Sequence, residues 1–165
     1  MNLTRTAVGL LRVFLVLLLV LCVVGQFLSW PGQFAHLAQE EPLLAHLRWP
    51  LTATAILVLV GVEVVVVCVW RLLGMVTADR IFSPQALRWV DGIVWALAAT
   101  WLVAAAGSLA LGITIFATPE LRDPGVPALL VGMLLAAAVV VLLMVVMRAL
   151  LRQAVALRTD MDAVI

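Results

Sequence analysis

Four long apolar stretches govern how this chain of 165 residues can fold, because none of them offers the polar face that a helix in a soluble domain needs. A helix crosses the hydrocarbon core of a bilayer with about 20 apolar residues. The sequence therefore predicts an all-α, four-helix membrane bundle with up-down-up-down topology and a single domain. The predicted spans are residues 13–30, 51–70, 93–118 and 128–147, which end near a proline, a tryptophan or an arginine.

Composition agrees with a membrane protein and excludes several functions. The chain is 66% hydrophobic and 12% charged, with a mean hydropathy of +1.25, whereas soluble domains are roughly 45–50% apolar. A net charge of +1 leaves no basic stripe for phosphates, so nucleic acid is not an expected partner. No serine has a histidine and an acid arranged near it, and no glycine-rich phosphate cradle is present. We therefore expect no enzyme and no cofactor.

Arginines are distributed unequally between the two sides of the predicted bundle. Lys and Arg are retained on the cytoplasmic side of short loops, so this bias predicts orientation. It places both termini in the cytoplasm of a multi-pass protein of the bacterial cytoplasmic membrane. Only Arg48 and Arg122 fall on the outer side, and the arginines assigned to the inner side are Arg5, Arg12, Arg71, Arg80, Arg88, Arg148, Arg152 and Arg158.

The connections between the spans carry their own patterns. Leucines in the outer segment 31–50 suggest a short helix on the membrane surface. In the cytoplasmic loop 74–91, Ser83 and Pro84 are typical of an N-cap and first helical residue, so a helix should start there and run into the third span. The cytoplasmic tail 148–165 should continue the fourth helix.

Small residues suggest how the spans pack, because close approach of helices in lipid depends on them. One four-spaced stripe lies in the third span and another in the fourth. We expect Gly112 and Gly132 to meet in an antiparallel hairpin, although alanine-rich composition alone could produce part of this pattern. The stripe residues are Ala104, Ser108, Gly112, Ala128, Gly132 and Ala136.

Glu63 is the acidic residue that lies deep within a span, flanked by valines. A charge at the membrane centre costs about 2.5–3.5 kcal/mol on insertion scales, so the side chain should face the bundle interior. One interpretation is a proton- or cation-binding carboxylate; the other is a protonated core residue that is hydrogen-bonded to Thr100. No second ionisable residue at this depth provides a relay, which favours the second interpretation.

Two further sets of residues give weaker signals. His36 and Glu40 are spaced to share a helical face as metal ligands can be, but Pro42 separates them from His46, so no metal site is expected. Cys22 and Cys68 differ in depth by about 10 Å at 1.5 Å per residue, which excludes a disulfide. We expect both thiols to serve as apolar filler.

Two stretches on the predicted cytoplasmic side carry short patterns, D-R-I-F-S-P-Q-A-L-R at residues 79–88 and L-R-T-D-M-D-A-V-I at residues 157–165. They resemble domain of unknown function 2975, a family of small four-span bacterial membrane proteins. Asp160 stands where the family more often has glutamate, and Ala86 where asparagine is commoner. The family has no established reaction, and its members are often encoded beside a small helix-turn-helix regulator, so the resemblance implies a link to signalling or envelope response. The residues that look like the family patterns are Ile81, Phe82, Ser83, Leu87 and Arg88 in the loop, and Leu157, Arg158, Asp160, Asp162 and Ile165 in the tail.

Charged residues in these stretches could form an ion-pair cluster beneath the bundle. Such surface pairs are worth about 0–1 kcal/mol each, so the cluster would orient the chain or bind a partner rather than stabilise the fold. The sequence thus favours a non-enzymatic interaction, signalling or envelope-response component, which binds another protein or itself. The alternative is a small transporter or proton-coupled carrier using Glu63. The candidate interaction residues are Phe82, Ser83, Arg88, Arg158, Asp160 and Asp162.

Overall fold

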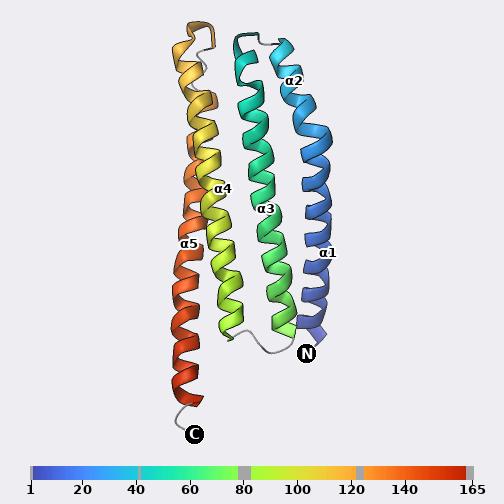
Figure 1. Cartoon of the computed structure of the whole chain (residues 1–165), viewed down its shortest axis with the longest axis vertical. Helices are drawn as coiled ribbons and strands as arrows, with labels where there is room; N and C mark the ends of the chain where they lie inside the picture. The colour runs from blue at the N-terminus through green and yellow to red at the C-terminus, as the bar shows by residue number, and fades with distance from the viewer. Residues whose placement is uncertain (1, 41, 78–82, 122–124, 163–165) are drawn as a thin grey trace.

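The computed structural model of the chain describes residues 2–40, 42–77, 83–121 and 125–162. Four long helical rods run side by side, and α1 begins at the same end of the molecule at which α5 ends (Figure 1). We call the end at which α1 begins and α5 ends the terminal end, and we call the other end of the molecule the opposite end. The elements are α1 (Asn2–Val24), η1 (Gly25–Ser29), α2 (Trp30–Glu40), η2 (Pro42–Leu47), α3 (Arg48–Thr77), α4 (Pro84–Ala117), η3 (Pro119–Leu121) and α5 (Gly125–Asp162).

The predicted all-α membrane fold is confirmed. Four rods are long and apolar enough to cross a bilayer, and they cover Thr6–Glu40, Pro42–Thr77, Gln85–Ala117 and Gly125–Leu157. Each rod is longer than the span predicted for it. Helical geometry persists beyond the apolar stretch because every backbone group can still be satisfied within the helix. The protein is therefore a multi-pass membrane protein.

The segment predicted as an outer loop with a surface helix has a different structure. A π-helical turn, η1, joins α1 to α2, and α2 carries the first rod on toward the opposite end (Figure 1). Trp30 and Phe34 stack within α2, with ring centroids 5.7 Å apart. Among the leucines that suggested a surface helix, Leu37 lies in α2 and continues the first rod, whereas Leu43, Leu44 and Leu47 lie in η2 at the start of the second rod.

The rods pack in chain order as a row. Within the described residues, the extensive contacts between rods join the first to α3, α3 to α4, and α4 to α5. The α3–α4 pair makes the most extensive contact and forms the centre of the row. The first rod and α5 flank this centre, so each has one extensive neighbour.

Three glycines bring α3 and α4 together. A methyl group on Gly61 of α3 would overlap Oγ1 of Thr100 on α4. In the reverse direction, a Cβ on Gly107 of α4 would lie 2.5 Å from Cγ2 of Thr54 on α3. Nearer the terminal end, a Cβ on Gly92 would lie 3.3 Å from Sγ of Cys68. We call these three contacts the glycine seam.

The seam has a simple register. Thr54, Gly61 and Cys68 recur every seven residues along α3, so they lie on one face of the helix. Both threonine hydroxyls donate hydrogen bonds within their own helix. Oγ1 of Thr54 donates to the carbonyl oxygen of Pro50 at 2.9 Å, and Oγ1 of Thr100 donates to that of Ala96 at 2.7 Å. The hydroxyls are thereby satisfied without a polar partner across the interface.

The predicted pairing of Gly112 with Gly132 is wrong. A Cβ on either glycine would meet no atom within 4 Å outside its own local helix. Gly132 is exposed on α5, on the same face as Ala128 and Ala136, whereas half-buried Leu130 and Leu134 face α4. Bulky side chains therefore occupy this interface. On α4, Ala104 and Ser108 line a hollow of 530 Å³ that Thr54 and Leu130 also line.

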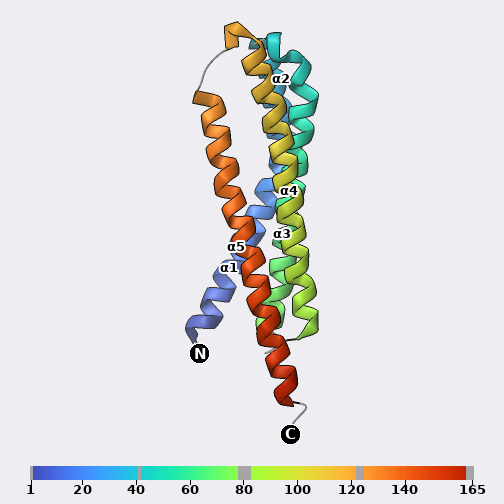
Figure 2. The same cartoon turned by 90° about the vertical axis from the view of Figure 1, so that its left-hand side faces the viewer.

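The α4–α5 pair is close only along part of its length. The Trp101 indole Nε1 donates a hydrogen bond to the carbonyl oxygen of Leu134, at 2.9 Å. Beyond this point α5 diverges from α4 toward the opposite end (Figure 2). A second hollow, of 750 Å³, lies between them there and is lined by Gly112, Phe116 and Leu134 among others.

Candidate functional site

A hydrogen-bonded polar pair lies in the middle of the first two rods. Nε2 of Gln26, in the π-helical turn η1, donates to Oε1 of Glu63 on α3 at 3.0 Å. Both side chains are half-buried. Single π-helical turns inside α-helices are uncommon and frequently occur at functional sites. The irregular turn therefore coincides with the one acidic side chain deep within a described rod.

The hydrogen bond expected between Glu63 and Thr100 is replaced by the bond from Gln26. Thr100 instead donates to its own helix and packs against Gly61, two residues before Glu63. Residues two apart on a helix point in different directions, so α3 presents Gly61 to α4 and Glu63 to the first rod. The position of Glu63 in the sequence indicated its depth along the helix, but it did not indicate which neighbouring helix the side chain faces.

A hollow of 370 Å³ adjoins the carboxylate. Glu63 and four other α3 residues line it, together with Leu19 and Val23 of α1 and Trp89 of α4. Three of its valines, Val60, Val64 and Val67, are each more than two-fifths exposed on the surface of the row. The hollow is thus open at the side where a bilayer would contact the protein, and its lining is apolar apart from the carboxylate.

A charged cluster ties α4 to α5 near the terminal end. Nε of Arg148 pairs with Oδ1 of Asp91, and Nη2 of Arg152 pairs with Oδ2 of the same carboxylate at 3.0 Å. The two arginines are four residues apart, so they share a face of α5. We call these three residues the aspartate clamp. It joins two rods just where their apolar stretches end.

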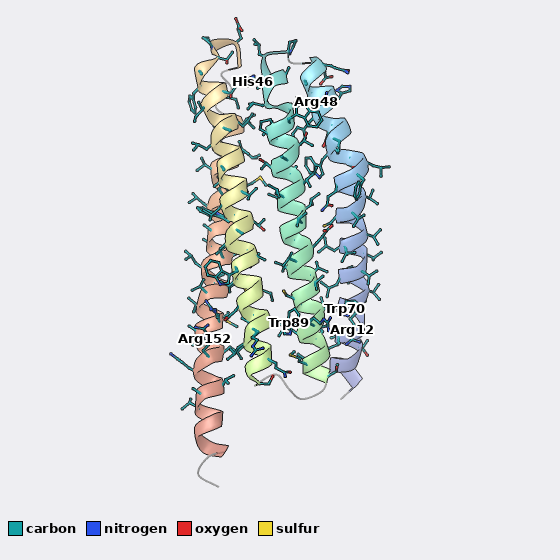
Figure 3. The ribbon with its side chains drawn as sticks, in the orientation of Figure 1. Arg12, His46, Arg48, Trp70, Trp89 and Arg152 are labelled. Atoms are coloured by element: carbon teal, nitrogen blue, oxygen red, sulfur yellow. The ribbon has the colours of Figure 1, made fainter. Side chains whose placement is uncertain are left out.

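Two contacts between arginine and tryptophan tie the other rods at the same end. The guanidinium carbon of Arg12 on α1 lies 5.7 Å from the ring centre of Trp70 on α3, and that of Arg71 lies 5.6 Å from the ring centre of Trp89 on α4. Figure 3 shows Arg12, Trp70, Trp89 and Arg152 toward the terminal end. Each neighbouring pair of rods is therefore joined there by a contact that involves an arginine.

The predicted loop and tail residues are only partly described. Ser83 is an N-cap as predicted, since its Oγ accepts a hydrogen bond from the backbone N of Ala86 at 3.3 Å and Pro84 follows it. Arg88 is exposed on α4. Phe82 lies outside the described residues. The side chains of Arg158, Asp160 and Asp162 also lie outside the described part, so their predicted cluster with Arg88 stays a prediction.

The histidines and cysteines do not assemble into a reactive centre within the described residues. His36 and Glu40 do share a face of α2, where Nδ1 and Oε2 are 3.4 Å apart and both side chains are exposed. No group of three metal-binding side chains is found in this part of the chain, and His46 lies in the separate turn η2. Cys22 and Cys68 are free, buried thiols.

Gln26 and Asp91 are the residues that reasoning from sequence missed. Gln26 is a polar residue beside a glycine within an otherwise apolar stretch, and this could have marked it as a partner for Glu63. Asp91 precedes the third predicted span, and the pair Arg148 and Arg152 follows the fourth. Antiparallel neighbours bring such flanks together, so opposite charges at these positions were an available signal.

Comparison with known proteins identifies one match. No curated protein and no solved structure matches the chain. The model of the family described as "Protein of unknown function (DUF2975)" matches residues 32–165, which includes α3, α4, α5 and both stretches that resemble this family in sequence. This match over most of the chain shows that the protein belongs to the DUF2975 family.

Proposed function

We propose that this protein is a non-enzymatic membrane component of an interaction, signalling or envelope-response system, and that it engages its partner through the terminal end of α5. The position of α5 carries this proposal. Its 38 residues correspond to about 57 Å at 1.5 Å per residue, far more than the roughly 30 Å of a hydrocarbon core. The helix extends past the other three rods at the terminal end (Figures 1 and 2).

The projecting helix has features suited to a partner. The aspartate clamp fixes it to α4 at Arg148 and Arg152, so the residues beyond continue from an anchored base. Leu150 and Leu157 are both more than half exposed and are seven residues apart, which places them on one face. An exposed apolar face on a helix that projects from its bundle is the pattern that packs into a groove or against a second helix. The partner is a second copy of this chain or another protein.

Site-specific photo-crosslinking in native membranes tests this proposal. A photoreactive residue at Leu157, which is 65% exposed, should give a discrete protein adduct. The matched control is Leu142 on the same helix, which is 64% exposed but lies within the apolar stretch. This position should react with lipid. If Leu157 yielded no protein adduct, or Leu142 yielded the same one, the interaction proposal would be wrong.

The proposal also places the terminal end in the cytoplasm of a bacterial cell, on the arginine bias. Cysteine labelling of intact cells tests the orientation, because Gln39 and Gln153 are both exposed and lie at different ends. A membrane-impermeant maleimide should label Gln39→Cys in intact cells and Gln153→Cys only after permeabilisation. The native thiols are buried and provide the background control. The reverse labelling pattern would contradict this orientation.

A small carrier centred on Glu63 is the second candidate function. The π-helical turn opposite this carboxylate favours it, because irregular backbone at membrane depth usually lines a cavity or a substrate path. In reconstituted vesicles, a carrier would show flux of an organic cation that Glu63→Gln abolishes. An absence of protein-dependent flux would leave the interaction component as the sole proposal.

A further inference from the structure

The hollow beside Glu63 combines a charge with a predominantly apolar wall. Its volume of 370 Å³ lies within the roughly 300–1,000 Å³ typical of small-molecule sites. Valines from α1 and α3 form much of the lining, and the carboxylate of Glu63 lies among them. The exposed valines leave the hollow open toward the bilayer. A ligand could therefore enter from the membrane without crossing a polar surface.

The carboxylate has a neutral hydrogen-bond donor and no cationic partner among the described residues. Gln26 donates one hydrogen bond to Oε1, but an amide cannot balance a negative charge. Asp91 provides the contrast, since two arginines pair with it. The ion pairs found in the described part of the chain do not include Glu63. When Glu63 is ionised, charge complementarity at this depth thus calls for a cation supplied by a ligand.

The wall chemistry selects an organic cation over a metal ion. Hard cations such as Ca²⁺ take six to eight oxygen ligands, and Mg²⁺ requires near-octahedral oxygen coordination. This hollow offers one carboxylate and, beside it, one amide. Trp89 adds an indole to the lining, and Arg71 already lies over that ring at 5.6 Å. Aromatic faces attract alkylated or delocalised cations in the same way.

We propose that the hollow between α1 and α3 binds a lipophilic organic cation, such as a quaternary ammonium or phosphonium compound, with its charge on Glu63 and its apolar groups among the valines. Gln26 is a positioning residue that holds the carboxylate toward the hollow. The π-helical turn η1 is the local irregularity that aims Gln26 at α3. This proposal concerns ligand binding only, so it can be tested independently of the protein partner proposed for α5.

Equilibrium binding of tetraphenylphosphonium to the purified full-length protein in detergent tests this site. Tetraphenylborate has the same shape and the opposite charge, so it retains the apolar contacts and reverses the sign of the interaction with Glu63. We expect saturable binding of the phosphonium and at least about tenfold weaker binding of the borate. Glu63→Gln should weaken phosphonium binding at least about tenfold, since the half-buried charge partner is lost. Equal binding of both ions, or no phosphonium binding, would overturn the proposal.

Two further variants separate the site from general effects. Glu63→Gln is nearly isosteric and its amide can still accept from Gln26, so its thermal unfolding should match that of the native chain. Glu63→Asp retains the charge and should bind more tightly than Glu63→Gln. Glu40→Gln removes an exposed carboxylate of α2 and should leave binding unchanged. If Glu63→Gln bound the phosphonium as tightly as the native protein, the assignment to this carboxylate would be wrong.

Discussion

The α3–α4 and α4–α5 interfaces share one helix but are built differently. At the first, glycines receive threonine or cysteine side chains, and the two backbones approach closely along the seam. At the second, an indole hydrogen bond and the aspartate clamp hold two regions, while hollows remain toward the opposite end. Without a hydrophobic effect to drive association in lipid, packing depends on such local fit. The α3–α4 interface should therefore tolerate little added side-chain volume, whereas the α4–α5 interface should be adjustable, in the sense that it can accommodate such changes.

The largest effect is expected at Gly61. In Gly61→Ala the new methyl group would overlap Oγ1 of Thr100, and rotation of Thr100 would break its bond to Ala96. Overpacking of this kind costs about 2–3 kcal/mol of the free energy of unfolding. Unfolding in mixed micelles, followed by circular dichroism, measures this loss. Thr100→Ala in the same chain should restore part of it, and additive losses in the double variant would contradict the proposed contact.

A pair of substitutions within α4 compares the two interfaces directly. Gly107→Ala places its Cβ 2.5 Å from Cγ2 of Thr54 and should lower the unfolding free energy by about 1–2 kcal/mol. Gly112 lies five residues away beside the 750 Å³ hollow, so Gly112→Ala should change the unfolding free energy by less than about 0.5 kcal/mol. Unfolding in mixed micelles, followed by circular dichroism, measures the unfolding free energy of both variants. Equal losses would show that α5 is as tightly packed on α4 as α3 is.

Much of this contrast could not be obtained from the sequence. Apolar length predicted the four rods, and the Ser83–Pro84 pair predicted the start of α4. Gly61 and Thr100 belong to different helices, so their contact depends on relative rotation and register, which no single helix specifies. The stripe at Gly132 was equally regular in sequence, yet it faces away from α4. Small residues indicated where two helix backbones could approach closely, but they did not indicate which neighbouring helix would pack there.

The candidate site was predictable to a similar extent. Its carboxylate was evident, because an acid among valines is unusual at that depth. Its hydrogen-bond donor was not, because Gln26 reaches α3 from a π-helical turn and regular helical spacing does not predict such a turn. The aspartate clamp was missed for a related reason. Asp91 pairs with Arg148 and Arg152 of another helix, and which faces of α4 and α5 meet depends on their relative rotation, which neither helix specifies by itself.

A smaller effect is expected where the aspartate clamp holds the adjustable interface. Asp91→Asn removes the charge that Arg148 and Arg152 share, at a partly exposed position. The unfolding free energy should fall by about 1 kcal/mol, and the difference from the native chain should shrink at high salt through screening. Glu120→Gln, an exposed acid at the opposite end, is the control. An equal loss in the control would mean that net charge, rather than the clamp, is responsible.

The smallest effect is expected for Gly132→Leu, although the sequence pattern predicted a large one. If Gly132 packed against Gly112, a leucine would force the helices apart and cost several kcal/mol. In the structure Gly132 is exposed and a Cβ there meets nothing within 4 Å, so a leucine would project into lipid. The unfolding free energy should change by less than about 0.5 kcal/mol. A large loss in mixed micelles would show that this face is covered by another helix, either α4 in a rotated register or a second copy. Crosslinking of Gly132→Cys would distinguish these two, since only a second copy yields a disulfide-linked dimer.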